Sequence, residues 1–294
     1  MALKYKVNKT TILNFAKKIG YKTSKTPLLT NEEIEYVIAN YKNKLAREIA
    51  DELNVSKSLI TKIWREHGLK GKGNNTYHIN ENYFENIDSK DKAYILGVIA
   101  SDGCVYKRKN HKHMLSFGFH IQEEDIINII LKYMESNYKP KYSDNKITLQ
   151  INNNKLVEDL EQYNITTRKT WRYCPTEIDN NFIWDYLRGY FDGDGSVYYR
   201  NNGLLPSDYT IVFCGNYKTM EFISNILKEN GIIHIFKQDN RPEKYSHDFY
   251  SIRIRENYSK YLFIKLLYAD CDDIKLNRKY NKCMEFIKIY KTPI

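Results

Sequence analysis

Two segments of the chain share one pattern, and this repeat limits what the chain can fold into. Residues 94–106 and 186–198 each begin with an apolar run of helical periodicity, pass through Asp-Gly and end in a strand-like Val-Tyr. A single Asp-Gly is typical of a surface turn. Two copies in the same context instead predict a duplicated helix-to-strand unit.

Small residues recur four positions apart in both segments, as Gly97 and Ser101 and as Gly189 and Gly193. This spacing places the small residues on one face of a helix, where a second helix backbone can approach closely. We therefore predict that the two helices pack against each other through these faces.

Asp102 and Asp194 each precede a glycine, Gly103 or Gly195, that suits the C′ position of a helix. A carboxylate at a helix C-terminus meets the negative end of the macrodipole. If the helices pair in parallel, the two carboxylates converge and repel each other unless a cation lies between them. Oxygen ligands of this kind favour Mg²⁺.

The segments that follow repeat the same order of elements, so we expect two similar α/β halves. The expected strands are 104–109, 114–121, 141–142, 146–151, 196–201, 209–213, 232–238 and 249–254, and the expected helices are 123–137, 155–163, 217–230 and 258–268.

These residues resemble the paired motifs of single-chain LAGLIDADG homing endonucleases. Residues 187–195 are close to the consensus of the motif. The first copy has Ala100 where the second has Asp192, so we do not expect the carboxylate of Asp192 to be essential. The resemblance covers residues 90–290. It implies an α+β fold in which two pseudo-symmetric αββαββα halves form a DNA-binding saddle.

The resemblance assigns Asp102 and Asp194 as catalytic and metal-binding acids. It also assigns one lysine near the end of each half, Lys169 and Lys279, to the scissile phosphates. Lys275 is a nearby alternative to Lys279. The other interpretation is that these lysines are basic residues on solvated loops. The ion is expected to be Mg²⁺ or Mn²⁺, with Ca²⁺ as a non-catalytic substitute. Further metal ligands could be the backbone carbonyls of Ala100 or Ser101 and of Gly193.

The N-terminal part carries the basic charge. Residues 1–80 hold 15 Lys/Arg against 7 Asp/Glu, whereas the remainder holds 31 against 29. Thr30 with Glu33 forms a capping-box pattern, and Ser56 is a second N-cap candidate. Together with expected helices at 31–38 and 45–53, these signals resemble a helix-turn-helix that reads the major groove. An ordinary three-helix bundle with a solvated face is the alternative.

The residues expected to contact DNA lie on the last helix of this arm and on one face of the sheets. In the arm they are Ser56, Lys57, Ser58, Thr61, Lys62 and Arg65. On the sheets, by a face assignment that a one-residue slip would invert, they are Lys107, Lys109, His111, His113, Arg200, Asn202, Lys237, Gln238, Arg241, Arg253 and Arg255.

The expected domain organisation follows from these motifs. Residues 7–22 echo residues 55–70, which indicates a partial second reading module. The expected divisions are residues 1–25 for this partial module, 26–72 for the helix-turn-helix domain, 73–89 for a linker, 90–175 for the first half and 176–294 for the second half.

Composition narrows the remaining classes. The five cysteines form no CxxC and the seven histidines form no HxxxH, which argues against a zinc site or a disulfide framework. No run of 18 apolar residues or signal peptide is present, so we expect an intracellular protein, cytoplasmic or nucleoid-associated, without a membrane partner.

We expect a monomeric, site-specific endonuclease of an intron-homing element that hydrolyses both strands of a long asymmetric DNA target. A cleavage-inactive DNA-binding regulator and an intron RNA maturase of the same fold remain alternatives.

Overall fold

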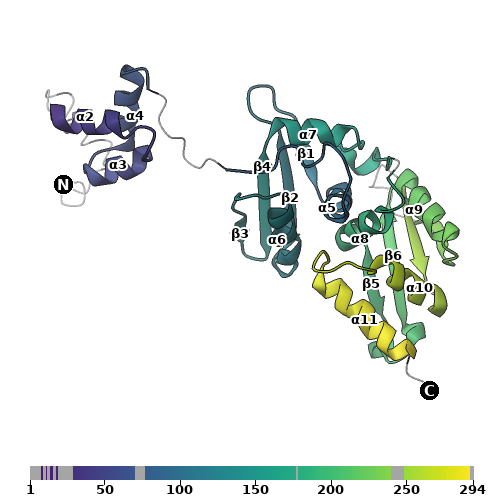
Figure 1. Ribbon diagram of the computed structural model, residues 1–294. Coiled ribbons are helices and arrows are strands. Elements are labelled where there is room, and N and C mark those ends of the chain that lie inside the picture. The colour runs from purple at the N-terminus through teal and green to yellow at the C-terminus, as the bar shows by residue number, and fades with distance from the viewer. Residues whose placement is uncertain are drawn as a thin grey trace. The chain divides into compact units, whose positions relative to one another are not determined.

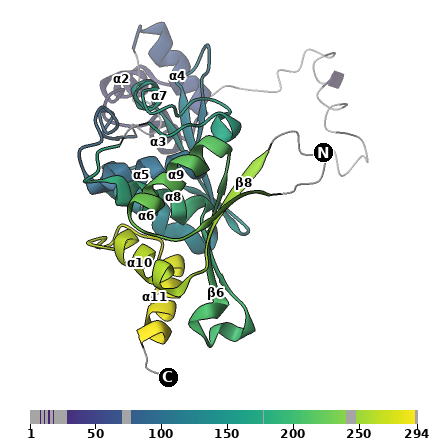
Figure 2. The ribbon, with the colours of Figure 1, turned by 90° about the vertical axis from the view of Figure 1, so that its right-hand side faces the viewer.

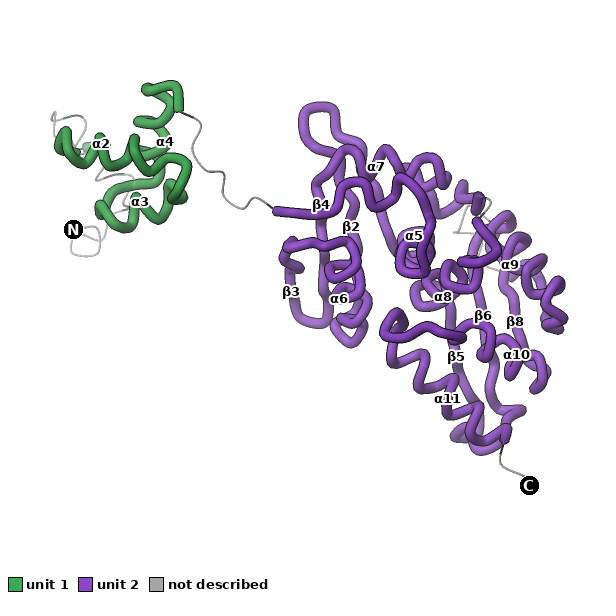
Figure 3. The backbone as a smooth tube through the Cα atoms, viewed as in Figure 1, with its two compact units in different colours: residues 1–76 green, residues 77–294 purple. Residues whose placement is uncertain are grey.

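The computed structural model contains two compact units, coloured separately in Figure 3. Unit 1 spans Met1–Thr76 and unit 2 spans Tyr77–Ile294. The partial module expected in residues 1–25 lies outside the described residues, apart from single positions. The structure describes residues 29–69, 77–176, 178–239 and 248–291, with the single positions 8, 11, 14, 15 and 18.

Unit 1 has its described helices where the capping signals indicated. Glu33 N donates to Thr30 Oγ1 (3.2 Å) and Thr30 N donates to the Glu33 carboxylate (2.8 Å), which forms the capping box. Asn54 adopts a left-handed conformation (φ 53°) in the turn before the last helix, and Ser56 accepts from the amide of Leu59. The helices are α2 (Asn31–Ala39), α3 (Ala46–Glu52) and α4 (Lys57–Glu66).

A small apolar core holds these helices together. Val37, Ile49 and Ile60 are fully buried. The indole of Trp64 is buried as well, and its Nε1 donates to the carbonyl of Val37 (2.9 Å), so the polar end of the ring is satisfied. The core fixes which face of α4 points outward.

Unit 2 contains two halves with the same order of elements (Figure 1). The first half has α5 (Lys90–Ser101), β1 (Cys104–Tyr106), β2 (Met114–His120), α6 (Glu124–Tyr133), β3 (Lys141–Ser143), β4 (Lys146–Asn152) and α7 (Asn154–Glu161). The second has α8 (Ile183–Asp194), β5 (Ser196–Tyr199), β6 (Tyr209–Gly215), α9 (Tyr217–Glu229), β7 (Ile235–Asp239), β8 (Phe249–Ile254), α10 (Asn257–Leu267) and α11 (Asn277–Lys291). This order confirms the expected α+β fold class.

Each half has one antiparallel four-stranded sheet, with strand orders β1-β2-β4-β3 and β5-β6-β8-β7. Side chains alternate along the strands, and in β4 every second residue is buried. Figures 1 and 2 show the helices gathered on one side of the two sheets. The opposite side of each sheet is left without helical cover.

The paired helices α5 and α8 lie between the two sheets (Figure 1). Eight of the twelve residues of α5 and nine of the twelve of α8 are buried, including Tyr94 and Ile99 in α5 and Phe191 in α8. A helix with buried residues on every face belongs inside a core. The motif helices therefore form the centre of unit 2, and their C-terminal ends are positioned by packing on every side.

Helix α11 was not among the expected elements. Its first turn carries Lys279, one of the two lysines that the resemblance assigns to the scissile phosphates. Cys283 and Phe286 anchor the helix in the core. Residues 280, 283, 284 and 287 recur with helical spacing, so the periodicity that predicts this helix is present in the sequence.

Candidate active site at the paired helix ends

The backbones of α5 and α8 touch through their glycines. A β-carbon added to Gly97 would overlap the carbonyl oxygen of Tyr186 and lie 2.7 Å from the amide nitrogen of Tyr190. One added to Gly189 would overlap the carbonyl oxygen of Tyr94. Because only a hydrogen fits at either position, the predicted docking of two small-residue faces is present in the structure.

The same docking brings the two motif acids together. Asp102 caps the end of α5, and one of its carboxylate oxygens lies 2.7 Å from the position that a β-carbon of Gly193 would take. Asp194, the next residue, is the last residue of α8. The carboxylate of one helix therefore lies directly against the end of the other.

The protein surroundings raise the pKa of both acids. Solvent reaches Asp102 and Asp194, but the helix ends around them remove part of their hydration. Burial, and next the charge of Asp194, raise the pKa of Asp102 to about 6. Burial also raises the pKa of Asp194, although Lys169, Lys279 and a hydrogen bond with Tyr190 oppose it.

Lys169 covers the end of α5. It follows Arg168, which is left-handed (φ 59°), and opens the 3₁₀ turn Lys169–Trp171. Its buried Nζ donates to the carbonyls of Ala100 (2.6 Å) and Ser101 (2.8 Å). A cation at a helix C-terminus is favourable. Burial lowers the pKa of Lys169 to about 8, and the charges of the two motif acids oppose this.

Lys279 occupies the matching place at the end of α8. Its buried Nζ lies within hydrogen-bond distance of four carbonyl oxygens. Burial lowers the pKa of Lys279, and the charge of Asp192 opposes this most strongly. The four acceptors are the carbonyls of Phe191 (2.7 Å), Asp192 (2.7 Å), Gly193 (3.0 Å) and Gly195 (2.6 Å).

These hydrogen bonds bear on the backbone carbonyls considered as metal ligands. Those of Ala100 and Ser101 accept from Lys169, and that of Gly193 accepts from Lys279. A dication bound to the same oxygens would lie next to an ammonium group, which is unfavourable. The two carboxylates therefore remain as the candidate oxygen ligands, although the charges of both lysines act to lower their pKa values.

Asp102 and Asp194 fit a hard divalent ion. Within the described ranges, no three His, Cys, Asp or Glu side chains gather as a metal-binding group. Mg²⁺ is commonly held by one or two carboxylates, with substrate phosphates and water completing its shell. Two repelling carboxylates with raised pKa values match that ligand set, because a cation between them relieves the repulsion.

Each lysine-bearing segment docks on the opposite half. In the first half, the carbonyl of Thr170 accepts from Asn216 at the start of α9 (3.2 Å). In the second half, the amide of Asn277 donates to Asp125 in α6 (3.1 Å). Both lysine positions thus depend on contacts that cross between the halves.

Asp192 is fully enclosed behind Lys279. Its Oδ2 accepts from the hydroxyl of Tyr94 in α5 (2.8 Å) and from the amide of Leu276 (2.7 Å), just before α11. Burial raises the pKa of Asp192 to about 6. Sequence reasoning gave Asp192 little weight, because its partners come from distant segments that no local pattern reveals.

The first half lacks this polar arrangement. Ala100 takes the place of Asp192, and the hydroxyl of Tyr186, which matches Tyr94, pairs instead with the hydroxyl of Tyr173 (2.8 Å). The two helix ends are therefore alike in shape but different in chemistry.

A buried ion pair also distinguishes α8 from α5. Arg188 and Asp185 lie 2.5 Å apart, and Arg188 further donates to the carbonyls of Ile274 and Leu267. The matching residues of α5 are Leu96 and Ala93. The loop before α11 is thus held by polar contacts that have no counterpart in the first half.

The glycines after the motif acids have a different role from the one expected. Neither Gly103 nor Gly195 is left-handed; Gly195 is extended (φ −78°, ψ 162°). A β-carbon on Gly103 would lie 2.7 Å from Ile99 Cα, and one on Gly195 would lie 2.5 Å from the carbonyl oxygen of Phe191. Close packing, not a left-handed turn, requires glycine here.

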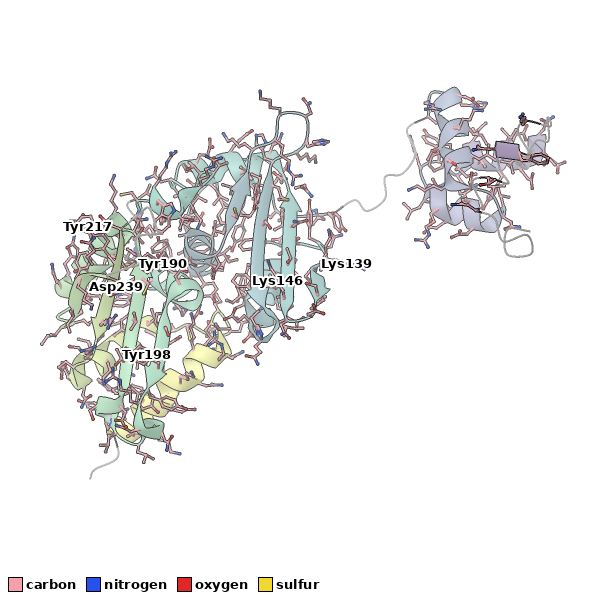
Figure 4. The ribbon with its side chains drawn as sticks, turned by 180° about the vertical axis from the view of Figure 1, so that it is seen from behind. Lys139, Lys146, Tyr190, Tyr198, Tyr217 and Asp239 are labelled. Atoms are coloured by element: carbon pink, nitrogen blue, oxygen red, sulfur yellow. The ribbon has the colours of Figure 1, made fainter. Side chains whose placement is uncertain are left out.

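The uncovered sheet faces carry some of the predicted DNA-binding side chains. Lys237 and Arg253 lie on the uncovered face with Asp239, which pairs with both (3.8 Å and 3.5 Å). The predicted place of Gln238 on this face is wrong, because alternation along β7 puts its side chain on the helix side with Phe236. Figure 4 views this face and labels Lys146, Tyr198 and Asp239.

The remaining predicted side chains lie in loops or outside the described residues. Lys107 lies just after β1 and forms an ion pair with Glu161 of α7 (2.6 Å), and its contact with DNA stays a prediction. His113 is half-buried, and Arg241 lies outside the described residues. Exposed loop or strand-end positions hold Lys109, His111, Arg200, Asn202 and Arg255.

Strand residues on the uncovered face of the first half were missed. The register pairs Ser116 with Gln150 and His120 with Lys146, and each of these side chains alternates with a buried neighbour. The strict alternation of β4 is the signal that could have found them.

All six predicted side chains of α4 are exposed. The buried positions of this helix are Ile60, Ile63 and Trp64, so the opposite face is open to solvent. A helix-turn-helix role for this face stays a prediction. The exposed residues are Ser56, Lys57, Ser58, Thr61, Lys62 and Arg65.

Comparison with known proteins finds a family that matches part of unit 2. Residues 181–267, which span α8 to α10, match the LAGLIDADG-like domain family. The chain therefore contains a LAGLIDADG-like domain in its second half, and the resemblance seen in the sequence is confirmed there. A comparison with curated protein sequences found no match.

Solved structures similar to the chain include three nucleases of this type, each described as bound to DNA. Meganuclease I-SmaMI is 12% identical over 69% of this chain and 91% of its own, with a TM-score of 0.47. The homing endonuclease I-GzeII is 11% identical over 68% and 89%, with a TM-score of 0.49. I-LtrWI is 11% identical over 72% and 90%, with a TM-score of 0.46.

Proposed function

We propose that the chain is a metal-dependent endonuclease that hydrolyses phosphodiester bonds in both strands of a specific DNA duplex. The observation that carries the proposal is the convergence of two acids at tightly docked helix ends. One carboxylate oxygen of Asp102 lies against Gly193, immediately before Asp194. The LAGLIDADG-like domain of the second half supports the same activity.

Asp102 and Asp194 would hold Mg²⁺ or Mn²⁺, with Ca²⁺ as a substitute that does not support cleavage. When bound, such an ion supplies an activated water and stabilises charge on the phosphate. The docked helices keep the two carboxylates in place before DNA binds. The two similar halves match the two strands of a duplex, and their different chemistry matches an asymmetric target.

The sheets and unit 1 would supply DNA binding. The uncovered sheet faces present Lys146, Lys237 and Arg253, which can contact phosphates or base edges. In unit 1 the exposed face of α4 would enter the major groove and lengthen the recognised site. The basic charge of residues 1–80 favours a polyanion as its partner.

A cleavage assay tests the proposal. The first substrate is a duplex in which the DNA sequences on the two sides of the gene are joined directly. The second is a library of duplexes with randomised sequence. We expect cutting with Mg²⁺, none with EDTA, and none for Asp102→Asn or Asp194→Asn, with duplex binding retained. The matched control is Glu158→Gln, which removes a carboxylate exposed on α7, away from the helix ends.

Three results would contradict the proposal. Normal cutting by either aspartate variant would show that the acids are not the metal site. Tight duplex binding without any cutting would indicate a DNA-binding regulator. Stronger binding to folded intron RNA than to duplex DNA in a gel-shift assay would indicate a maturase.

A further inference from the structure

The two lysines at the helix ends have different numbers of hydrogen-bond donors left. An ammonium group has three N–H donors. Lys279 Nζ lies within 3.0 Å of four carbonyl oxygens, so all of its donors are in use. Among the described residues, Lys169 Nζ has two such acceptors, the carbonyls of Ala100 and Ser101, and one donor remains.

We propose that the two lysines have different roles: Lys169 donates to a DNA phosphate, whereas Lys279 is a positioning residue that holds the end of α8 and contacts no DNA. This inference rests on the proposed function, because it assigns the lysines of the same site. It replaces the expectation that both lysines approach the scissile phosphates.

The surroundings of Lys279 support a positioning role. Its backbone amide donates to the carbonyl of Leu276 (3.1 Å), and the amide of Leu276 donates to Asp192 (2.7 Å). Asp192 in turn accepts from Tyr94 of the other motif helix (2.8 Å). Lys279 is thus fixed to both motif helices, through its side chain and through the backbone before it.

The surroundings of Lys169 leave more freedom. Its position has no counterpart of Asp192, because Ala100 occupies the matching place. The short turn Lys169–Trp171 carries it, preceded by Arg168 in a left-handed conformation. Moving this ammonium group toward a phosphate breaks only its hydrogen bonds to the two carbonyls of α5.

Salt dependence of DNA binding separates the two roles without relying on cleavage. Removing one contact between a cationic side chain and a phosphate lowers the slope of log K against log salt by about 0.9. We expect Lys169→Met to lower the slope by about that amount, with a small change in Tm. Lys279→Met should leave the slope unchanged, lower the Tm clearly and reduce kcat for cleavage of one strand.

The measurement uses the full-length chain with Ca²⁺ and fluorescence anisotropy on the duplex that the cleavage assay selects. The matched control is Lys265→Met, which removes the same charge from an exposed position on α10. Equal slopes for Lys169→Met and Lys265→Met would overturn the phosphate contact. A lower slope for Lys279→Met than for this control would overturn the positioning role.

A second variant, Asp192→Ala, keeps the inference testable if Lys279→Met fails to fold. This substitution gives the second half the alanine that the first half has at the matching position, Ala100. We expect it to reduce kcat for the same strand at an unchanged KM and salt slope. Asp192→Asn, which keeps an acceptor oxygen for Leu276, should recover part of the rate. A normal rate in Asp192→Ala, or no recovery in Asp192→Asn, would contradict the role of Asp192.

Failure of the inference is distinguishable from failure of the proposed function. If the wild-type chain cuts no duplex, the endonuclease proposal fails, and the salt slopes on a mixed-sequence duplex still test the lysine roles. If the wild type cuts and the slopes of the two lysine variants are equal, the lysine assignment alone is wrong.

Discussion

The close approach of α5 and α8 makes a sharp prediction for Gly189→Ala. The new β-carbon would overlap the carbonyl oxygen of Tyr94 and lie 2.8 Å from its carbonyl carbon. Carbon atoms prefer separations of about 3.5–4.0 Å, so α5 and α8 must move apart by about 1 Å. Overpacking of this kind costs about 1–3 kcal/mol or more, against a helix-propensity gain of about 1 kcal/mol. We expect a net loss of about 2 kcal/mol in the free energy of unfolding.

Urea denaturation of the full-length chain measures this loss, and strand cleavage measures the displacement of the acids. The control is Gly118→Ala on the uncovered face of β2, where the nearest atom is the flexible Cε of Lys146 (3.0 Å). The control should change stability by no more than about 1 kcal/mol. If Gly189→Ala is as stable as the wild type and cuts normally, the helices are not in backbone contact, and the account of how the acids converge is wrong.

Three further predictions follow from other contacts. Removal of residues 1–72 should weaken duplex binding and lower its salt slope while cleavage chemistry persists; an unchanged slope would exclude a DNA contact by unit 1. Arg188→Leu should destabilise unit 2 by about 3–5 kcal/mol, because it leaves Asp185 buried without its partner, and adding Asp185→Ala should restore part of the loss in thermal unfolding. Burial lowers the pKa of Lys260 to about 8 from 10.5, so the unfolded chain binds more protons between these values and stability should rise with pH across that window. Lys260→Met should flatten this rise, and an equally steep rise in the variant would assign it to another group.

Most of the architecture could be predicted from the sequence, because the patterns that indicate helices and strands are local. The spacing of Gly97, Gly189 and Gly193 predicted docked helices, and Thr30 and Ser56 marked helix starts that the structure contains. Alternation in β4 predicted a half-buried strand. Each of these features depends on a period of two or four residues or on a cap, which a single segment reveals.

The chemistry around the acids could not be predicted in the same way. Lys279 meets α8 across more than 80 residues of sequence, and Asp192 meets Leu276 across 84. No periodicity encodes such pairs. The roles of Gly103 and Gly195 were misread for a related reason, because the atoms that exclude a side chain there belong to the packed core and not to the turn.

The cross-docking of the lysine segments has a consequence for engineering. Thr170 accepts from Asn216, and Asn277 donates to Asp125, so each half carries a contact for the segment that bears the other half's lysine. In a chimera that exchanges one half for that of a relative, the contact residues for the lysine-bearing segments would no longer match at either helix end. Altered specificity in such a chimera therefore requires transplanting α6 or α9 together with the partner segment that rests on it.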